Sequence, residues 1–338
     1  MKHLLDKTMR CAAAGALAVA LMAGAAAADL YKVTATGTGA APFIVNTAIA
    51  KVVNTHVDGV EFQVRATGAA TRHFVDAATG KADFIFGSST INWLLVNHFG
   101  PFKDFTNGPE LEEKVGMIFA YQIGPYHYLT RADSGIMSLD DLRGRTVFAG
   151  PPGGAATGVV LRAIEEATGI KAEEMRVQQY GFDSAMQAFQ DDKLDVLVIS
   201  TNVPSPSIQQ FALTKEIRIL NVPLEKVTIR TNVGGTANEI APDAYGDNQV
   251  NETPVTTHGA IVNFSAGMHV DEEVVYQVTK AIWENLDEIH ETAQWMPTTV
   301  TPEKALSQIA GRLHPGAERY YREQGWDIPA PMVYTPGN

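Results

Sequence analysis

The feature that most constrains the fold of this 338-residue chain is a succession of strand and helix patterns that occurs twice along it. The strands of the first copy are expected at 30–35, 60–66 and 83–87, and its helices at 43–56 and 69–78. The strands of the second copy are expected at 146–149, 175–179 and 195–199, and its helices at 159–167 and 183–190. Strands that alternate with helices predict a parallel, doubly wound α/β sheet, and two such successions predict two of them.

Two local matches support an internal repeat. The sequence KADFIFGS at 81–88 recurs as KLDVLVIS at 193–200, so that Lys, Asp and Ser each repeat at a shift of 112 residues. Gly-rich turns follow the first strand of each copy, at 36–42 and at 150–157. Chance is an alternative for the single match, because K-x-D before a strand is common. The same order across three strands favours two similar α/β lobes.

Segments outside the two copies predict how the lobes connect. The stretch 114–128 is apolar and aromatic and lies between the copies, and 258–264 has the pattern of another apolar strand. The segment 271–290 has the clearest helical stripe of the chain, with three acids in its first turn. We therefore expect two crossings that form a hinge. The expected division of the chain is lobe 1 at 29–122 plus 256–338 and lobe 2 at 123–255.

The amino terminus has the pattern of a secretory signal peptide at 1–28. Three basic residues and one acid accompany an Ala-rich apolar run at 11–28 that ends in small residues. A buried or membrane-anchoring helix is the alternative, although the run is short for a membrane span. Cleavage after Ala28 would remove Cys11, the single cysteine, and would change the net charge from −12 to about −14. We expect export to a bacterial periplasm.

Composition and missing motifs exclude several functions. The 38 acidic against 26 basic side chains disfavour nucleic-acid binding, because phosphates require a basic surface. A mature chain without cysteine excludes thiol chemistry and Cys-ligated metals. The sequence has no G-x-S-x-G, H-E-x-x-H or Walker motif, and the turn at 36–42 lacks the third glycine of a dinucleotide fingerprint. We expect no metal and no cofactor, and a binding protein is favoured over an enzyme.

The turns and strand ends of the two copies are the candidate ligand contacts. Carboxyl ends of parallel strands in facing lobes border one crevice, where open α/β sheets bind ligands. Gly37, Gly39 and Gly153 are expected to bring backbone N–H groups close to a bound carboxylate. Ordinary turn chemistry is the alternative for all of these positions. The polar side chains expected to bind beside them are Thr38, Ser88, Ser89, Thr157 and Asn202.

One cation and three aromatic residues complete the candidate site. Arg72, at the start of a predicted helix, is the candidate counter-charge for a carboxylate, and a solvated arginine is the alternative. Phe43, Phe86 and Trp93 are expected either in an apolar cleft wall or in the core. Of these three, Phe43 belongs to the predicted contact set.

The chain resembles the TAXI family of solute receptors of tripartite ATP-independent periplasmic (TRAP) transporters over nearly all of the expected mature chain. LHPGAERYY at 313–321 is the most specific piece of the resemblance. The softer pieces are RADSGI at 131–136 with SLDDLRG at 138–144, K-x-D at 193–195 with Val203-Pro204, and VVY at 274–276 with ENL at 284–286.

The resemblance implies a type II periplasmic-binding-protein fold that closes on a small anion, such as glutamate or a dicarboxylate, and then docks on TRAP membrane subunits. Thr38 matches a family hydroxyl. Pro42-Phe43 replaces a usual Tyr pair, and GGAA at 153–156 replaces Gly-Ser-Gly-Thr. Losing a hydrogen-bond donor to a buried anion costs about 1–3 kcal/mol, enough to change ligand preference. A more apolar acid is therefore expected as an alternative to the glutamate-like ligands.

Asn202 and Arg72 also depart from the family pattern, in which glycine and an acid are usual at these positions. The alternatives to a TRAP receptor are a binding protein that feeds another transporter or a sensor kinase, and an exported hydrolase. The hydrolase would use Ser88 or Ser200 as its nucleophile.

Overall fold

The computed structural model describes residues 28–332, so the predicted signal peptide lies outside the described residues except for Ala28. Within this part of the chain, ten strands form a continuous sheet in the order β2-β1-β3-β10-β4-β7-β5-β6, with β8 beside β4 and β9 beside β10. The strands are β1 (Asp29–Ala35), β2 (Val60–Ala66), β3 (Phe84–Ser88), β4 (Val115–Arg131), β5 (Thr146–Phe148), β6 (Arg176–Val177), β7 (Val196–Ser200), β8 (Ile217–Ile219), β9 (Gly235–Ile240) and β10 (Val255–Gly267). The α-helices are α2 (Ala41–His56), α3 (Ala70–Ala78), α4 (Ser89–Val96), α5 (Gly108–Glu112), α6 (Ala155–Thr168), α7 (Phe182–Gln190), α8 (Pro206–Ala212), α9 (Glu272–Glu284), α10 (Leu286–His290), α11 (Met296–Thr299), α12 (Pro302–Ala305) and α13 (Pro315–Glu323).

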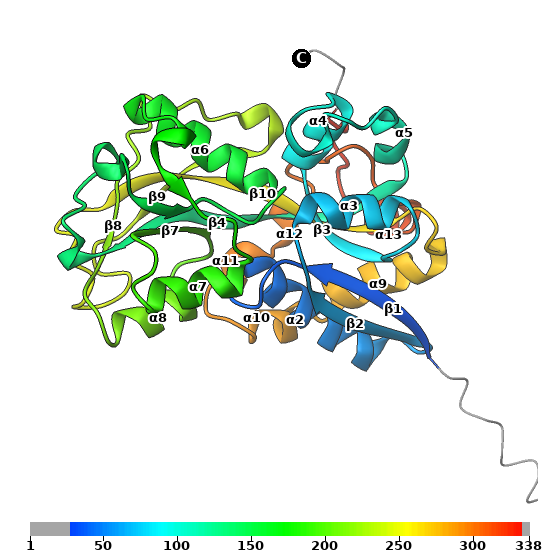
Figure 1. The fold of residues 1–338 in the computed structure, drawn as a ribbon. Helices are drawn as coiled ribbons and strands as arrows, with labels where there is room; N and C mark the ends of the chain where they lie inside the picture. Colours follow the sequence, from blue (N-terminus) through cyan, green and yellow to red (C-terminus); the bar gives the residue numbers. More distant parts are fainter. Residues whose placement is uncertain (1–27, 333–338) are drawn as a thin grey trace, which may run out of the picture.

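Two lobes lie side by side along this sheet (Figure 1). Lobe 1 is built on parallel strands β2, β1 and β3, with β10 antiparallel to β3. Lobe 2 is built on parallel strands β6, β5 and β7, with β4 antiparallel to β7. Helices α2, α3, α9 and α13 accompany lobe 1, and α6, α7 and α8 accompany lobe 2 (Figure 1). The predicted α/β fold of two doubly wound lobes joined by two crossings is confirmed.

The strands β4 and β10 pass from one lobe to the other while pairing with each other. Gly124 lies at this passage in β4, with a φ of +91° that favours glycine. A Cβ at Gly124 would lie 2.3 Å from Oδ1 of Asn202, so no larger residue fits without a shift. The β10 side has an irregular register between Gly259 and Ile261. The division at 122/123 and 255/256 stays a prediction.

The K-x-D repeat has the same structural role in both lobes. In lobe 1, Asp83 Oδ2 accepts the N–H of Lys32 in β1 at 2.7 Å, and the N–H of Asp83 donates to the Lys32 carbonyl at 3.1 Å. In lobe 2, Asp195 Oδ2 accepts the N–H of Thr146 in β5 at 2.7 Å, and the N–H of Asp195 donates to the Thr146 carbonyl at 2.9 Å. Each aspartate therefore fastens the third strand of its lobe to the first.

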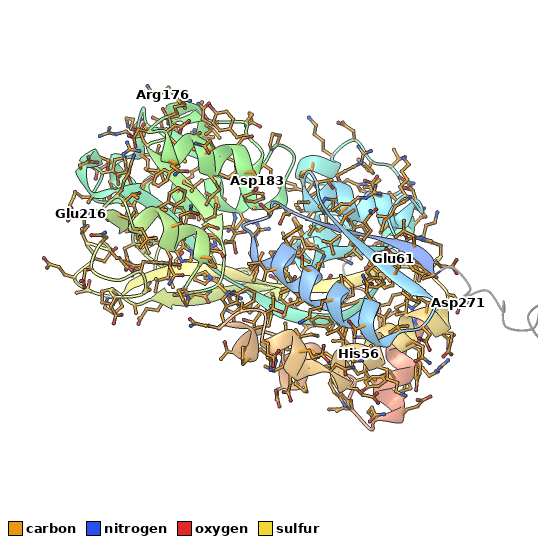
Figure 2. The ribbon with its side chains drawn as sticks, turned by 90° about the horizontal axis from the view of Figure 1, so that it is seen from below. His56, Glu61, Arg176, Asp183, Glu216 and Asp271 are labelled. Atoms are coloured by element: carbon orange, nitrogen blue, oxygen red, sulfur yellow. The ribbon has the colours of Figure 1, made fainter. Side chains whose placement is uncertain are left out.

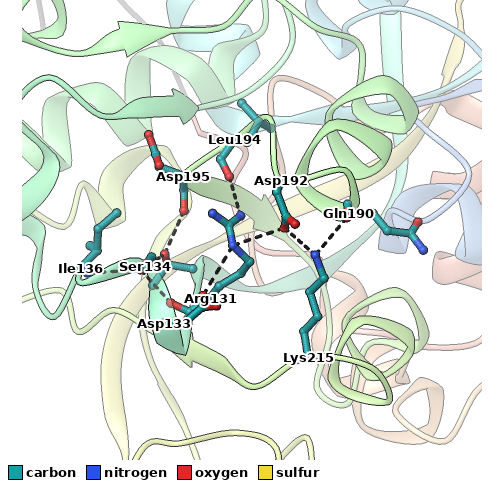
Figure 3. A network of polar contacts seen from close by, with 10 residues as sticks. Arg131, Asp133, Ser134, Ile136, Gln190, Asp192, Leu194, Asp195 and Lys215 are labelled. Carbon is teal, nitrogen blue, oxygen red and sulfur yellow. Dashed lines mark hydrogen bonds and ion pairs between the residues drawn. The ribbon is translucent and has the colours of Figure 1, made fainter.

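A polar network holds the turn before β7 against the end of β4 (Figure 3). Arg131 Nη1 donates to the carbonyl of Leu194 at 2.9 Å, and its Nε lies 3.3 Å from Oδ1 of Asp192. Lys215 Nζ donates to the same carboxylate oxygen at 2.5 Å. This hydrogen bond, together with the charge of Arg131, holds the pKa of Asp192 below its usual value. The network serves the architecture of lobe 2.

Two predicted elements differ from those observed. The helix expected at 271–290 is interrupted at Asn285, where ψ is 35° and the side-chain amide donates to the carbonyl of Ala281 at 2.9 Å. The backbone N–H of Asn285 donates to the same carbonyl at 3.1 Å, so the side chain shares this acceptor, and the φ of −122° takes Asn285 out of the helical region and ends α9. The strand expected at 175–179 is the two-residue β6. Among the described helices, none is long and apolar enough to span a membrane.

Candidate functional site

A cavity of ≈ 280 Å³ lies between the two lobes, beside the crossing strands. Lobe 1 lines it with the turn after β1, the end of β3, helix α4 and the turn at 99–101. Lobe 2 lines it with the Gly-rich turn before α6, helix α6 itself and the segment 227–230. Such a volume is slightly below the ~300–1,000 Å³ of drug-sized ligand pockets. The site therefore accommodates a small molecule at the carboxyl ends of the strands.

Most side chains that line the cavity are apolar. Examples from both lobes are Phe86, Trp93, Phe99, Val159, Phe182 and Val198. The sequence left a cleft wall and the core as the two possibilities for Phe43, Phe86 and Trp93. Phe86 and Trp93 lie in the wall of the cavity, whereas Phe43 lies outside its lining. Burying apolar ligand surface is worth about 25 cal/mol per Å², so the walls favour a ligand with an apolar body.

Three hydroxyl groups of the lining have partners within the protein. Thr90 Oγ1 donates to the carbonyl of Val233 at 2.9 Å, and Ser200 Oγ donates to that of Gly124 at 3.2 Å. Ser88 Oγ accepts the N–H of Ile91 at 3.2 Å and caps α4. Among residues 28–332, the Ser88 hydroxyl has no acceptor for its own hydrogen. Ser88 is therefore placed to donate to a ligand.

Two arginines of lobe 2 line the cavity. Arg162, on α6, is paired with Glu166 one helical turn later, with 3.0 Å between Nη1 and Oε1. Arg230 follows the segment 227–229, and its guanidinium carbon lies 5.3 Å from the ring centroid of Trp93 in a cation–π geometry. The wall thus carries positive charge beside aromatic surface.

A buried histidine from β10 closes one side of the cavity. His258 stacks on Tyr126 with 4.5 Å between ring centroids, and its Nε2 lies 2.7 Å from the hydroxyl of Tyr128. Burial, with a smaller effect of Arg162, lowers the pKa of His258 to about 4. Burial also raises the pKa of Tyr126 to about 12. Both groups are neutral near pH 7, so they add polarity without charge.

The two lobes touch each other around the cavity. Thr71 Oγ1 of lobe 1 donates to the carbonyl of Gly153 in lobe 2 at 2.7 Å. Thr38 Oγ1 donates to Oδ1 of Asp183 at 3.2 Å, and Asp183 lies on the side of lobe 2 that faces lobe 1 (Figure 2). A Cβ on Gly37 would lie 2.6 Å from Cβ of Phe182, so this glycine permits the close approach. The structure is that of a closed pair of lobes.

Of the ten predicted contact residues, Ser88 lines the cavity and the other nine lie outside its lining. Gly37, Thr38 and Gly153 take part in the contacts between the lobes described above, and Gly39 lies against Ser207 of lobe 2. These turns therefore contribute contacts that join the two lobes.

The remaining predicted residues have partners within the protein. Ser89 Oγ donates to Gln308 Oε1 at 2.8 Å, Thr157 Oγ1 donates to the carbonyl of Pro151 at 2.9 Å, and Asn202 Nδ2 donates to Thr299 Oγ1 at 3.0 Å. Phe43 is half-buried near the start of α2.

Arg72 lies on the solvent side of α3 rather than in the cavity lining. Its side chain is 68% exposed and pairs with Asp76 at 3.0 Å. Its neighbours Thr71 and His73 are buried, so the helix turns Arg72 outward. Arg72 therefore matches the alternative that the sequence left open, a solvated arginine.

Sequence reasoning did not single out Arg162, Arg230 or His258. Arg162 has the sequence signature of an ordinary i,i+4 pair with Glu166, and Arg230 lies in a segment without periodicity. The sequence pattern places His258 only in an apolar crossing strand. The position of Arg162 on the helix that follows a Gly-rich turn is the one signal that could have indicated it.

The chain is similar to a known family and to several solved structures. The sequence pattern of the NMT1-like family matches residues 33–325. Among solved structures, the aliphatic sulphonate binding protein SsuA of Escherichia coli is 12% identical, with a TM-score of 0.43 and coverage of 91% of this chain and 93% of that one. A TRAP solute binding protein of Ralstonia eutropha with bound (S)-2-acetolactate is 11% identical, with a TM-score of 0.47 and coverage of 89% and 86%. The sugar acid binding protein DctPAm of Advenella mimigardefordensis, in complex with galactonate, is 12% identical, with a TM-score of 0.48 and coverage of 89% and 86%.

Proposed function

The chain belongs to the NMT1-like family, and on this premise we propose that it is a solute receptor that encloses a small organic anion between its two lobes. The observation that carries the proposal is the cavity of ≈ 280 Å³ between lobes that touch at Thr71–Gly153 and Thr38–Asp183. Its apolar walls and two arginines suit an anion with an apolar body.

Binding without chemistry is part of the proposal. A serine hydrolase needs a general base within hydrogen-bond reach of its nucleophile. Ser88 Oγ contacts the N–H of Ile91, and Ser200 Oγ contacts the carbonyl of Gly124. The nitrogen His258 Nε2 is engaged by the Tyr128 hydroxyl. These partners support a receptor over the hydrolase alternative.

We further propose that the receptor acts in the periplasm and delivers its ligand to the membrane subunits of a TRAP transporter of the TAXI type. The sequence resemblance at 131–144 and 313–321 supports this assignment, and the net charge of −12 fits an exported protein with no nucleic-acid partner. Delivery to another transporter or to a sensor kinase is the alternative. We propose no metal and no cofactor.

A thermal-shift screen of the purified protein against small carboxylates tests the binding proposal. A true ligand raises the melting temperature progressively with its concentration, because it binds only the folded state. Ser88→Ala should weaken this shift by about 2- to 10-fold in apparent affinity, as expected for one hydrogen bond. Turnover of a carboxylate ester or amide, instead of simple binding, would favour the hydrolase.

The transport assignment needs a separate experiment. Proteoliposomes that contain TRAP membrane subunits should take up the ligand only when the loaded receptor and an ion gradient are present, without ATP. Uptake that requires ATP hydrolysis by a different membrane complex would assign the receptor to another transporter class.

A further inference from the structure

We infer that the ligand is a monocarboxylate with an apolar body and no amino group, held at its carboxylate by Arg230. The inference rests on the proposed function and specifies the ligand class of the same site. It follows from a comparison of the charges that line the cavity with the charges that already have partners.

The charge of Arg162 is compensated within lobe 2. Glu166 Oε1 lies 3.0 Å from Arg162 Nη1, and the same nitrogen donates to the carbonyl of Thr228 at 3.2 Å. Glu166 Oε2 also accepts the N–H of Thr228 at 2.7 Å, which fixes the carboxylate in place. Arg162 and Glu166 together therefore add no net charge to the cavity wall.

The charge of Arg230 is not compensated by the described part of the protein. Among residues 28–332, no carboxylate lies within ion-pair distance of its guanidinium. The guanidinium lies over Trp93, 5.3 Å from the ring centroid, at the border between the aromatic wall of lobe 1 and the segment 227–229 of lobe 2. Arg230 is an exposed residue, so its guanidinium lies where the lining meets solvent and presents its donors to an anion that enters between the lobes.

Acidic side chains are absent from the described lining of the cavity. Asp183 lines a separate recess of ≈ 20 Å³, where its Oδ1 accepts the hydroxyl of Thr38. His258 is neutral near pH 7, as derived above. The uncompensated charge of the lining is therefore the single positive charge of Arg230.

A single positive charge selects among classes of anion. A monocarboxylate pairs with the exposed Arg230 and brings no further charge, whereas an amino acid places an ammonium group beside a guanidinium and a dicarboxylate places a second carboxylate against the apolar wall. Burying an unpaired charge is strongly unfavourable. The rest of the lining offers apolar contact from Phe86, Phe182 and Val198 and neutral hydroxyl groups such as that of Ser88, but no uncompensated charge that would pair with a second charged group. The geometry thus separates this ligand from glutamate and from dicarboxylates.

A matched set of ligands tests the inference by calorimetric titration of the purified full chain. The set consists of 4-methylpentanoate, leucine, which adds an ammonium group, 2-methylglutarate, which replaces one methyl by a carboxylate, and the neutral 4-methylpentanamide. The aromatic pair 3-phenylpropanoate and phenylalanine extends it. The monocarboxylates should bind at least about 10-fold more tightly than their matched relatives, since each mismatch leaves a charge or a donor unpaired.

Substitution of Arg230 tests the named contact. Arg230→Gln should weaken monocarboxylate binding by about 10- to 100-fold, the range expected for a charge-assisted hydrogen bond. Arg143→Gln in the same lobe removes an exposed arginine that pairs with Glu174, and it should leave the affinity unchanged. Glu166→Gln should free the charge of Arg162 and raise the affinity for 2-methylglutarate relative to 4-methylpentanoate.

The outcomes separate the inference from the proposed function. Tighter binding of leucine or 2-methylglutarate than of 4-methylpentanoate would overturn the inference and leave a solute receptor in place. Equal affinities of the Arg230→Gln and native proteins for 4-methylpentanoate would overturn the assignment of Arg230. No binding of any carboxylate at millimolar concentration would overturn both the inference and the receptor itself.

Discussion

The two lobes have the same scaffold and contribute different chemistry to the site between them. Their strand orders, β2-β1-β3-β10 and β6-β5-β7-β4, are equivalent, and each ends in a strand antiparallel to its neighbour. Asp83 and Asp195 fasten equivalent strands by the same pair of hydrogen bonds. Lobe 1, however, supplies Phe86 and Trp93 to the cavity, and lobe 2 supplies both arginines.

This difference shows that the two copies share their sheets but present different side chains to the cavity. At the shift of 112 residues, Phe86 of lobe 1 corresponds to Val198 of lobe 2, and Arg162 of lobe 2 corresponds to Ala50 of lobe 1. The lobes also differ in the length of their strands: β1 and β2 have seven residues each, whereas β5 has three and β6 has two. We expect lobe 1 to be the more strongly stabilised sheet.

The largest expected contrast between the lobes is in their cores. Phe84 and Val196 occupy equivalent repeat positions, and both are fully buried. Phe84 packs its ring 4.5 Å from Phe62 and 5.6 Å from Phe264, centroid to centroid. Phe84→Ala should lower the free energy of unfolding by about 3–5 kcal/mol and Val196→Ala by about 2 kcal/mol, as measured by urea denaturation. Equal losses would contradict the difference in core packing.

Acid sensitivity should be shared between the lobes. Burial lowers the pKa of His127 in lobe 2 and of His314 in lobe 1 to about 4. The unfolded chain binds a proton at each near pH 6.5, so stability is lost as the pH falls from about 6.5 to about 4, on the order of 3 kcal/mol per histidine. His127→Gln and His314→Asn should each flatten the pH dependence of urea denaturation over this range. A slope unchanged by both substitutions would show that these histidines are protonated in the folded protein.

Removal of the fastening aspartates should have a smaller effect. Asp83→Ala and Asp195→Ala each break a charge-assisted hydrogen bond to a neighbouring strand, at a cost of about 1–3 kcal/mol. The larger loss is expected for Asp195, because β5 has few other ladder bonds. Urea denaturation measures the loss of stability in each variant, and hydrogen exchange of the Lys32 and Thr146 amides measures the local loosening of the strands. Asp58→Ala, at an exposed position, is the control.

The contacts that join the lobes should affect ligand affinity most weakly. Thr71→Val removes the hydrogen bond to Gly153 while keeping the shape of the side chain, and Thr38→Val removes the bond to Asp183. Loss of one such bond corresponds to about 1 kcal/mol, or roughly 5-fold weaker binding. The loss of affinity should be smaller for Thr38→Val than for Thr71→Val, because Thr38 is exposed. Titration calorimetry measures the affinity, and small-angle scattering measures closure. Native affinity in both variants would place the closing contacts elsewhere.

Local sequence patterns were enough to predict the two lobes. Alternating residues such as those of Val60–Ala66 and helical stripes such as that of Glu272–Glu284 depend on neighbours a few positions apart, so they can be read along the chain. The K-x-D repeat then indicated that the same unit occurs twice. The break at Asn285 was missed, because an asparagine in a helical stripe is compatible with both outcomes.

The site was predicted less completely, for a physical reason. Ser88 lines the cavity because its position at the end of a buried strand is fixed by the sheet. The turn residues Thr38 and Gly153 instead contact the opposite lobe, and Arg72 points to solvent. Which side of a turn or helix faces the cavity depends on how the lobes close, and the sequence around these residues does not encode that orientation locally.

The sequence by itself determined an α/β chain with two similar lobes, an acidic surface and no motif for covalent chemistry. The tertiary structure alone decided that Arg230 and Trp93, which are far apart in the chain and belong to different lobes, meet at one cavity. Secondary structure follows from interactions between near neighbours, whereas charge and shape in a site between lobes follow from long-range packing.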